Sequence, residues 1–207
     1  MASAVTTEAE VCNGALLDVG HGQFIDNLNE NTMEAKACKV IYARTRDWLL
    51  ERFPWKFAQR RAVLALSLAE TRNAWAYCYA LPSDCLAPLS IAYPGLRNPQ
   101  QGSGIRFDWE AGVNGAIAGP GILTTDQSGA ELIYTAQVTT VALFTPGFVE
   151  ALEWALAAKL CLVLPIKPGV ALQVKAEARR SLHEAAAAMA NHSFQDLSPE
   201  SEFVTAR

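Results

Sequence analysis

Asp108 and Glu110 have the spacing most typical of catalytic chemistry in this chain. They lie two positions apart in a segment where apolar and polar residues alternate, so in a strand both side chains would project from one face. A pair of carboxylates flanking a glycosidic bond is how most glycoside hydrolases cleave it. Exposed carboxylates are also common on strands with one buried face, and this structural role is the interpretation we favour. No residue is therefore predicted to be catalytic, and Asp108 and Glu110 are kept as candidates for an alternative hydrolase function.

The other reactive side chains form no recognised catalytic or metal-binding motif. The sequence has no phosphate-binding glycine loop, no serine-hydrolase elbow and no zinc-ligand spacing. His21, His183 and His192 are interpreted as surface residues, and Asp84-Cys85 as a capping aspartate beside a buried thiol. The five cysteines include no Cys-x-x-Cys pair and are interpreted as reduced thiols. We therefore expect no metal, no cofactor and no enzymatic activity.

Sequence-specific binding to nucleic acid is not predicted either. The net charge is −4, so the chain lacks the basic surface that binds phosphates along a groove. Double-stranded DNA could still pass through a channel that such a protein lines, because a channel needs a surface that does not hold its contents. The arginine pairs are interpreted as solvated faces and the aromatic stripe as core, namely Arg44/Arg46, Arg60/Arg61 and Trp75/Tyr77/Tyr79.

Helical patterns occupy both ends of the chain. Residues 7–20 place their apolar side chains on one face, and Thr6 or Thr7 can cap this segment. The stretch after Thr32 is also amphipathic, with Trp48 expected on its apolar face and Arg46 on its polar face. Pro54 must end it because proline lacks the N–H that a helix needs. Two further helices are predicted over 145–164, where Pro146 takes the first helical position, and over 169–191.

Between these helices the apolar period changes to two. Residues 74–81 and 105–110 alternate, and 89–93, 122–124 and 131–138 complete an antiparallel set. The layout predicts an α+β fold, a helical bundle built from the N- and C-terminal helices with an inserted small antiparallel β-sheet. The domains are then 1–60 with 145–193 as one discontinuous helical bundle, 61–144 as the inserted β region, and 194–207 as a flexible C-terminal tail.

Neither secretion nor membrane insertion is expected. The first ten residues, MASAVTTEAE, lack the basic and apolar regions of a signal peptide. The longest apolar run, 154–164, is interrupted by Lys159 and is too short to span a bilayer. We therefore expect a protein that is made in a cytosol.

Several short stretches between about residue 10 and residue 160 match one known family pattern in the same order. They are VCNGALLDVG at 11–20, Ala35, Cys38, Tyr42, Arg46-Asp47, Leu50, PWKFA at 54–58, LPSDC at 81–85, ILTTD at 122–126, LIY at 132–134 and the segment 148–158. Together they resemble the tail tubular protein A family, the head–tail adaptors of short-tailed bacteriophages. Gly14 departs from the pattern, because the family has a larger aliphatic residue there. The glycine-rich segment 112–121 is also longer than the family's hairpin.

The resemblance implies a structural protein of the virion neck, made in the cytoplasm of the bacterial host. Such adaptors form a homo-oligomeric ring of twelve subunits below the portal protein. The ring extends the channel for the packaged double-stranded DNA, helps to retain the genome, and docks a tail nozzle similar to tail tubular protein B. The DNA passes through without its sequence being read, and no membrane insertion is implied.

Three sets of residues are assigned to contacts of this adaptor on the basis of position and composition. The apolar residues of the tail are expected to bind the portal, the third and fourth helices to form the subunit interface, and the glycine-rich tip to face the nozzle. The near all-apolar helix 146–164 must be buried by its own fold or by a neighbouring subunit. The sets are Phe194, Leu197, Phe203 and Val204 for the portal; Val149, Leu152, Leu156, Leu160, Arg179 and Arg180 for the subunit interface; and Asn114, Gly115 and Ile117 for the nozzle.

Two alternative functions remain open. The first is a virion-associated peptidoglycan hydrolase activity carried by the same protein, because some related adaptors are credited with one, and Asp108 and Glu110 are its candidates. The second is a head-completion protein that acts at another layer of the neck.

Overall fold

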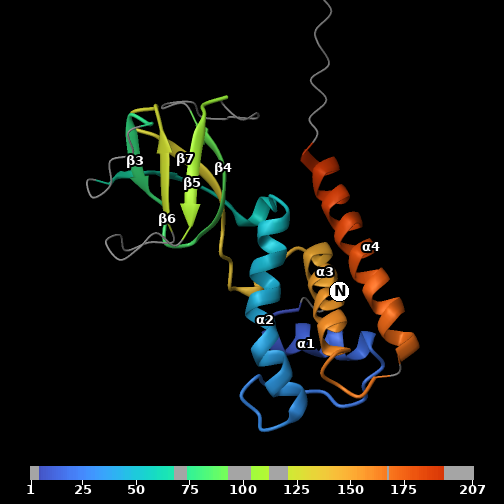
Figure 1. The fold of residues 1–207 in the computed structure, drawn as a ribbon. Helices are drawn as coiled ribbons and strands as arrows, with labels where there is room; N and C mark the ends of the chain where they lie inside the picture. Colours follow the sequence, from blue (N-terminus) through green and yellow to red (C-terminus); the bar gives the residue numbers. More distant parts are fainter. Residues whose placement is uncertain (1–4, 68–73, 93–103, 112–120, 167, 194–207) are drawn as a thin grey trace, which may run out of the picture.

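A computed structural model describes five stretches of the chain. Within them the fold is mixed, with four α-helices and two small antiparallel sheets (Figure 1). The α+β class predicted from the sequence is therefore confirmed. The described residues are 5–67, 74–92, 104–111, 121–166 and 168–193.

The four helices begin close to the predicted residues. Thr7 caps α1 through a capping box, because its Oγ1 accepts from the backbone N–H of Glu10 at 3.2 Å and Glu10 accepts from the backbone N–H of Thr7 at 2.9 Å. Thr32 caps α2 through its side chain, whereas Thr145 precedes α3 without a side-chain capping bond. The bounds are α1 Glu8–Asp18, α2 Met33–Arg52, α3 Pro146–Leu160 and α4 Pro168–Ser193.

Helix α3 contacts each of the other three helices. The first turn of α3 packs against Trp55, which follows α2 by three residues. Trp55 is fully buried, and its Nε1 donates to the backbone oxygen of Leu49 at 2.9 Å. The Trp55 ring lies edge-on to Phe148 of α3, with 5.0 Å between ring centroids, and the short 3-10 helix Lys56–Ala58 brings Phe57 to the same ring at 5.1 Å. Aromatic packing of this kind fixes where the chain leaves the helices for the strands.

The strands form two sheets instead of the one predicted. One sheet has the order β1-β7-β4 and the other β2-β3-β6-β5, with antiparallel pairing throughout. Only Leu64 separates β1 from β2, and its backbone N–H donates to Ala130 at 3.0 Å while its side chain is buried between the sheets' apolar residues. One chain segment therefore serves both sheets. The bounds are β1 Gln59–Val63, β2 Ala65–Leu66, β3 Tyr77–Ala80, β4 Cys85–Ala92, β5 Phe107–Ala111, β6 Gly121–Thr125 and β7 Glu131–Ala136.

Helix α2 stands next to the strands, with β4 and β7 in contact with it (Figure 1). Gln137, just after β7, donates through Nε2 to Oδ2 of Asp47 at 2.7 Å. Two side chains of α2 differ from the sequence prediction. Arg46, expected on the polar face, is buried because it pairs with Asp47 and Glu8 and its guanidinium lies over the Tyr42 ring. Trp48, expected on the apolar face, is 40% exposed.

Candidate functional site

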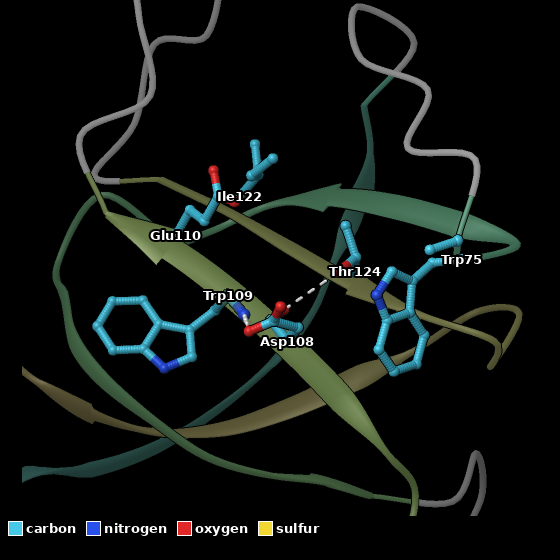
Figure 2. Close-up of a pocket in the computed structure, with 7 residues that line it drawn as sticks. Trp75, Asp108, Trp109, Glu110, Ile122 and Thr124 are labelled. Atoms are coloured by element: carbon cyan, nitrogen blue, oxygen red, sulfur yellow. Dashed lines mark hydrogen bonds between the residues drawn. The ribbon is translucent and has the colours of Figure 1, made fainter.

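A pocket of about 200 Å³ opens on the four-stranded sheet, around the two carboxylates singled out from the sequence (Figure 2). It is formed by the edge strand β5, by its neighbour β6, and by the turn that precedes β3. The residues that line it are Ala74, Trp75, Asp108, Trp109, Glu110, Ile122 and Thr124.

The register of β5 against β6 sets the positions of the two carboxylates. Asp108 is paired with Thr124 and Glu110 with Ile122, so both acids come from alternate positions of one strand, as predicted. The Thr124 hydroxyl donates to the backbone oxygen of Asp108 at 3.4 Å, and Oδ1 of Asp108 accepts from the backbone N–H of Trp109 at 2.8 Å. The Asp108 carboxylate thus already serves as an acceptor for its own strand.

The pocket has two features that suit a sugar ligand and lacks a third that hydrolysis requires. Trp75 and Trp109 offer aromatic surface, and carboxylates two residues apart on a strand have Cα atoms about 6.5–7 Å apart. Carboxylates on one face of a strand can also accept hydrogen bonds from sugar hydroxyls. A general acid, however, must be kept protonated by burial, and both Asp108 and Glu110 are exposed. The geometry therefore fits ligand contact better than bond cleavage.

The carboxylates with raised pKa lie elsewhere, where α1 packs on α3. Burial raises the pKa of Glu153 to about 7, with further contributions from Asp18 and Glu150. Burial, followed by the charge of Glu150, raises the pKa of Asp18 to about 6. Gly14 makes room for this cluster, because a Cβ at that position would come within 2.5 Å of the Glu153 carboxyl carbon. The sequence carries a signal for this site in Gly14, but the residue that needs the space could not be named from it.

The remaining reactive residues have structural roles. Burial raises the pKa of the Cys85 thiol to about 12, so it is not a nucleophile at neutral pH. Asp84 begins no helix, and its Oδ1 accepts from the Tyr134 hydroxyl at 2.9 Å. His21 is not a free surface residue, because its Nε2 lies 2.9 Å from Oε1 of the buried Glu34. The five cysteines form no disulfide bond.

The residues assigned to partner contacts are buried, exposed or outside the described residues. Val149, Leu152, Leu156 and Leu160 are buried in this chain's own core, which accounts for their apolar character without a neighbouring subunit. They offer no surface to a second subunit, and among the subunit-interface candidates only Arg179 and Arg180 are exposed. The portal candidates Phe194, Leu197, Phe203 and Val204 lie outside the described residues, as do the nozzle candidates Asn114, Gly115 and Ile117.

The described residues contain neither a cluster that could hold a metal ion nor a helix that could span a membrane. No group of three or more His, Cys, Asp and Glu side chains is placed there to hold a metal ion. No helix in the same stretches has the length and hydropathy to cross a bilayer.

Fold and pocket together define only a broad class, a mixed α+β protein with an exposed acidic and aromatic pocket on its sheet. The sequence matches no protein-family model and no curated protein. A more specific function has to be argued from where the residues of the family resemblance lie in the fold.

Proposed function

We propose that this chain is a structural head–tail adaptor of a short-tailed bacteriophage. In this proposal twelve copies form a ring below the portal, extend the DNA channel, help to retain the genome and dock the tail nozzle. The observation that carries the proposal is that stretches matched separately along the sequence contact one another in the fold.

Three such contacts join distant stretches of the resemblance. The thiol of Cys12, from the first stretch, forms a hydrogen bond with the thiol of Cys38, from α2. This hydrogen bond and burial raise the pKa of Cys12. Trp55, from PWKFA, packs on Phe148, which begins the last stretch. The matched residues therefore specify one fold, and their contacts are structural, as an assembly protein requires.

The third contact lies in the strands. Asp84, from LPSDC, accepts the hydroxyl hydrogen bond of Tyr134, from LIY, at 2.9 Å. It fixes the turn before β4 against β7, the central strand of the three-stranded sheet. A hydrogen bond between a carboxylate and a phenol contributes about 1.5–3 kcal/mol, and Tyr134 is buried, so the pair matters to the fold.

The proposal includes a finer architecture, in which 1–60 and 145–193 form one discontinuous helical bundle and 61–144 is inserted into it. Two separate apolar clusters support this division. One gathers the buried residues of the four helices together with Val138, Val141 and Phe144, which precede α3. The other lies among the strands and includes Leu64, Tyr79 and Tyr134. Two cores joined by short connections are what an inserted β region would produce.

The portal-binding part of the proposal is tested by deleting residues 194–207. The deletion is expected to abolish binding to the cognate portal ring while the helical circular dichroism and the melting temperature stay those of the full chain. The reason is that the deletion begins after the last residue of α4 and so keeps every described residue of both apolar clusters. Undiminished attachment of the shortened chain would refute this part.

A second candidate function is peptidoglycan hydrolysis in the sheet pocket. It is favoured by one observation, the convergence of Trp75 and Trp109 with Asp108 and Glu110. Clearing of peptidoglycan by the wild type should then be lost in Asp108→Ala/Glu110→Ala and kept in Glu51→Ala, which removes an exposed carboxylate of α2. Equal clearing by the wild type and both variants would exclude the pocket as the active site. No clearing by the wild type would exclude the activity.

The remaining alternative, a head-completion protein at another layer of the neck, differs from the adaptor in its partner. It would bind a ring of a neighbouring neck protein and leave the portal ring unbound. The same binding experiment with each ring separates the two.

A further inference from the structure

A second pocket, of about 410 Å³, is lined by residues of α2, α3 and α4. Helices α3 and α4 lie on the side of α2 away from the strands (Figure 1). We call it the cationic groove. It combines four basic side chains with an apolar floor and contains no carboxylate. Its lining residues are Arg44, Trp48, Leu49, Ala155, Ala158, Lys159, Lys175, Ala178, Arg179 and Leu182.

The positive charge of the cationic groove is not neutralised by the described residues. Arg44, Lys175 and Arg179 form no ion pair within that part of the chain, and Lys159 donates through Nζ to the Thr45 hydroxyl at 2.7 Å. Burial, with repulsion from Arg44, lowers the pKa of Lys159. Four cations in one groove are unusual in a chain whose net charge is −4.

No acid of α2, α3 or α4 is among the residues that line the groove. Glu177 and Glu184 both pair with Arg180, at 3.0 and 3.5 Å, and neither lines the groove. Glu51, one turn beyond Trp48 on α2, is exposed and does not line it either. An anionic ligand would therefore meet cations without meeting a competing carboxylate.

The apolar floor of the groove means that a fitting ligand must carry apolar groups as well as negative charge. Trp48 is 40% exposed, and Arg52 lies over its ring at 4.8 Å, which extends the basic rim. Leu182 and the alanines of α3 and α4 complete a surface of small apolar side chains. A peptide with alternating acidic and large apolar residues satisfies both requirements.

We propose that the cationic groove binds the C-terminal segment of its own chain, residues 196–204. This segment, DLSPESEFV, carries three carboxylates and no basic residue, and it contains Leu197, Phe203 and Val204 as apolar anchors. Its charge is thus complementary to the groove, and its anchors match the apolar floor.

The length of chain after α4 permits this docking within one molecule. Leu182 and Lys175 lie eleven and eighteen positions before the end of α4 at Ser193, which is about 16 and 27 Å along the helix. At about 3.3 Å per extended residue, a chain that turns back along α4 covers these distances in about five to eight residues. With about two further residues used to reverse direction, residues 200–203 lie beside the groove.

This docking does not depend on the adaptor function, because it involves one chain alone. If the adaptor function holds as well, the groove and the portal compete for the same anchors. The free chain would then keep Phe203 and Val204 covered until a portal is present, which would prevent premature association of exposed apolar residues.

The proposal is tested on the full chain with benzoylphenylalanine, a photo-crosslinking amino acid, in place of Phe203. After irradiation, cross-links are mapped by mass spectrometry. We expect them within single chains, in the peptides that contain Trp48 and Lys175–Leu182. Cross-links at twice the chain mass would assign the groove to a second copy, and cross-links elsewhere or none at all would also overturn the proposal.

Two charge-reversed pairs separate groove binding from general electrostatics. Lys175→Glu/Arg179→Glu should reduce the groove cross-links about tenfold, because two attractive contacts become repulsive. Lys36→Glu/Lys39→Glu has the same charge change on exposed positions of α2 outside the groove and should leave the yield unchanged. Equal yields in the two variants, with unchanged melting temperatures, would refute the electrostatic docking.

Discussion

Glu153 provides the sharpest test of how the helices pack. Burial between α1 and α3, together with Asp18 and Glu150, raises the pKa of Glu153 from an ordinary value of 4.5 to about 7. The folded chain therefore holds a proton between these pH values that the unfolded chain has lost. Stability should fall as the pH rises from about 4.5 to about 7 and should then level off, because above that range both states are ionised.

The size of the effect follows from the same pKa values. A pKa raised from 4.5 to about 7 corresponds to about 3.4 kcal/mol at full strength. The side chain is partly open to water, so screening reduces this to about 1–2 kcal/mol. Glu153→Gln removes the ionisation but keeps the shape of the side chain. The variant should therefore be more stable than the wild type by about 1–2 kcal/mol at pH 8 and equal to it at pH 4.5.

Urea unfolding between pH 4.5 and pH 8, followed by circular dichroism, measures this difference. Glu51→Gln is the matched control, because it removes an exposed carboxylate from α2 and should leave the pH profile unchanged. Some decline remains in Glu153→Gln, since the pKa of Asp18 is also raised, to about 6. A variant that loses stability at pH 8, or that keeps the full wild-type decline, would refute the buried position of Glu153.

Three further predictions concern single contacts. Gly14→Ala gains helix propensity but displaces the Glu153 carboxyl group, so it should be more favourable in Glu153→Ala than in the wild type, with a coupling of about 1 kcal/mol in a double-mutant cycle of urea unfolding, and independent effects would contradict the close approach of the two residues. Trp55→Ala should cost about 3–5 kcal/mol of unfolding free energy, since the ring is fully buried, whereas Trp48→Ala should cost much less, and similar losses would contradict their different burial. Tyr134→Phe should lower stability by about 1.5–3 kcal/mol by leaving Asp84 without its hydroxyl donor, and a variant as stable as the wild type would argue against that hydrogen bond.

Local signals in the sequence were sufficient for most element boundaries. Thr7 with Glu10 specifies a capping box, and Pro54 ends α2 two residues after Arg52, because these effects act within one turn of chain. The alternation at Phe107–Ala111 likewise predicted a strand with both acids on one face. Each of these features depends on neighbours in the sequence alone.

What the sequence could not supply are contacts between distant segments. Arg46 was assigned to the solvent face because it is charged, but Glu8, from another helix, lets it be buried. The division into two sheets depends on where Leu64 inserts. Both pockets also depend on such contacts. In the first, Trp75 lies in the turn before β3 and Asp108 lies in β5. In the cationic groove, the basic residues come from three helices.

The adaptor function is tested most directly by the native mass of the purified 22.4 kDa chain, alone and after addition of the cognate portal ring. The proposal predicts a small species that becomes part of a ring-sized complex only when the portal is present, with a gain of twelve chain masses. No association with the portal at any ratio of the two proteins would contradict the adaptor function.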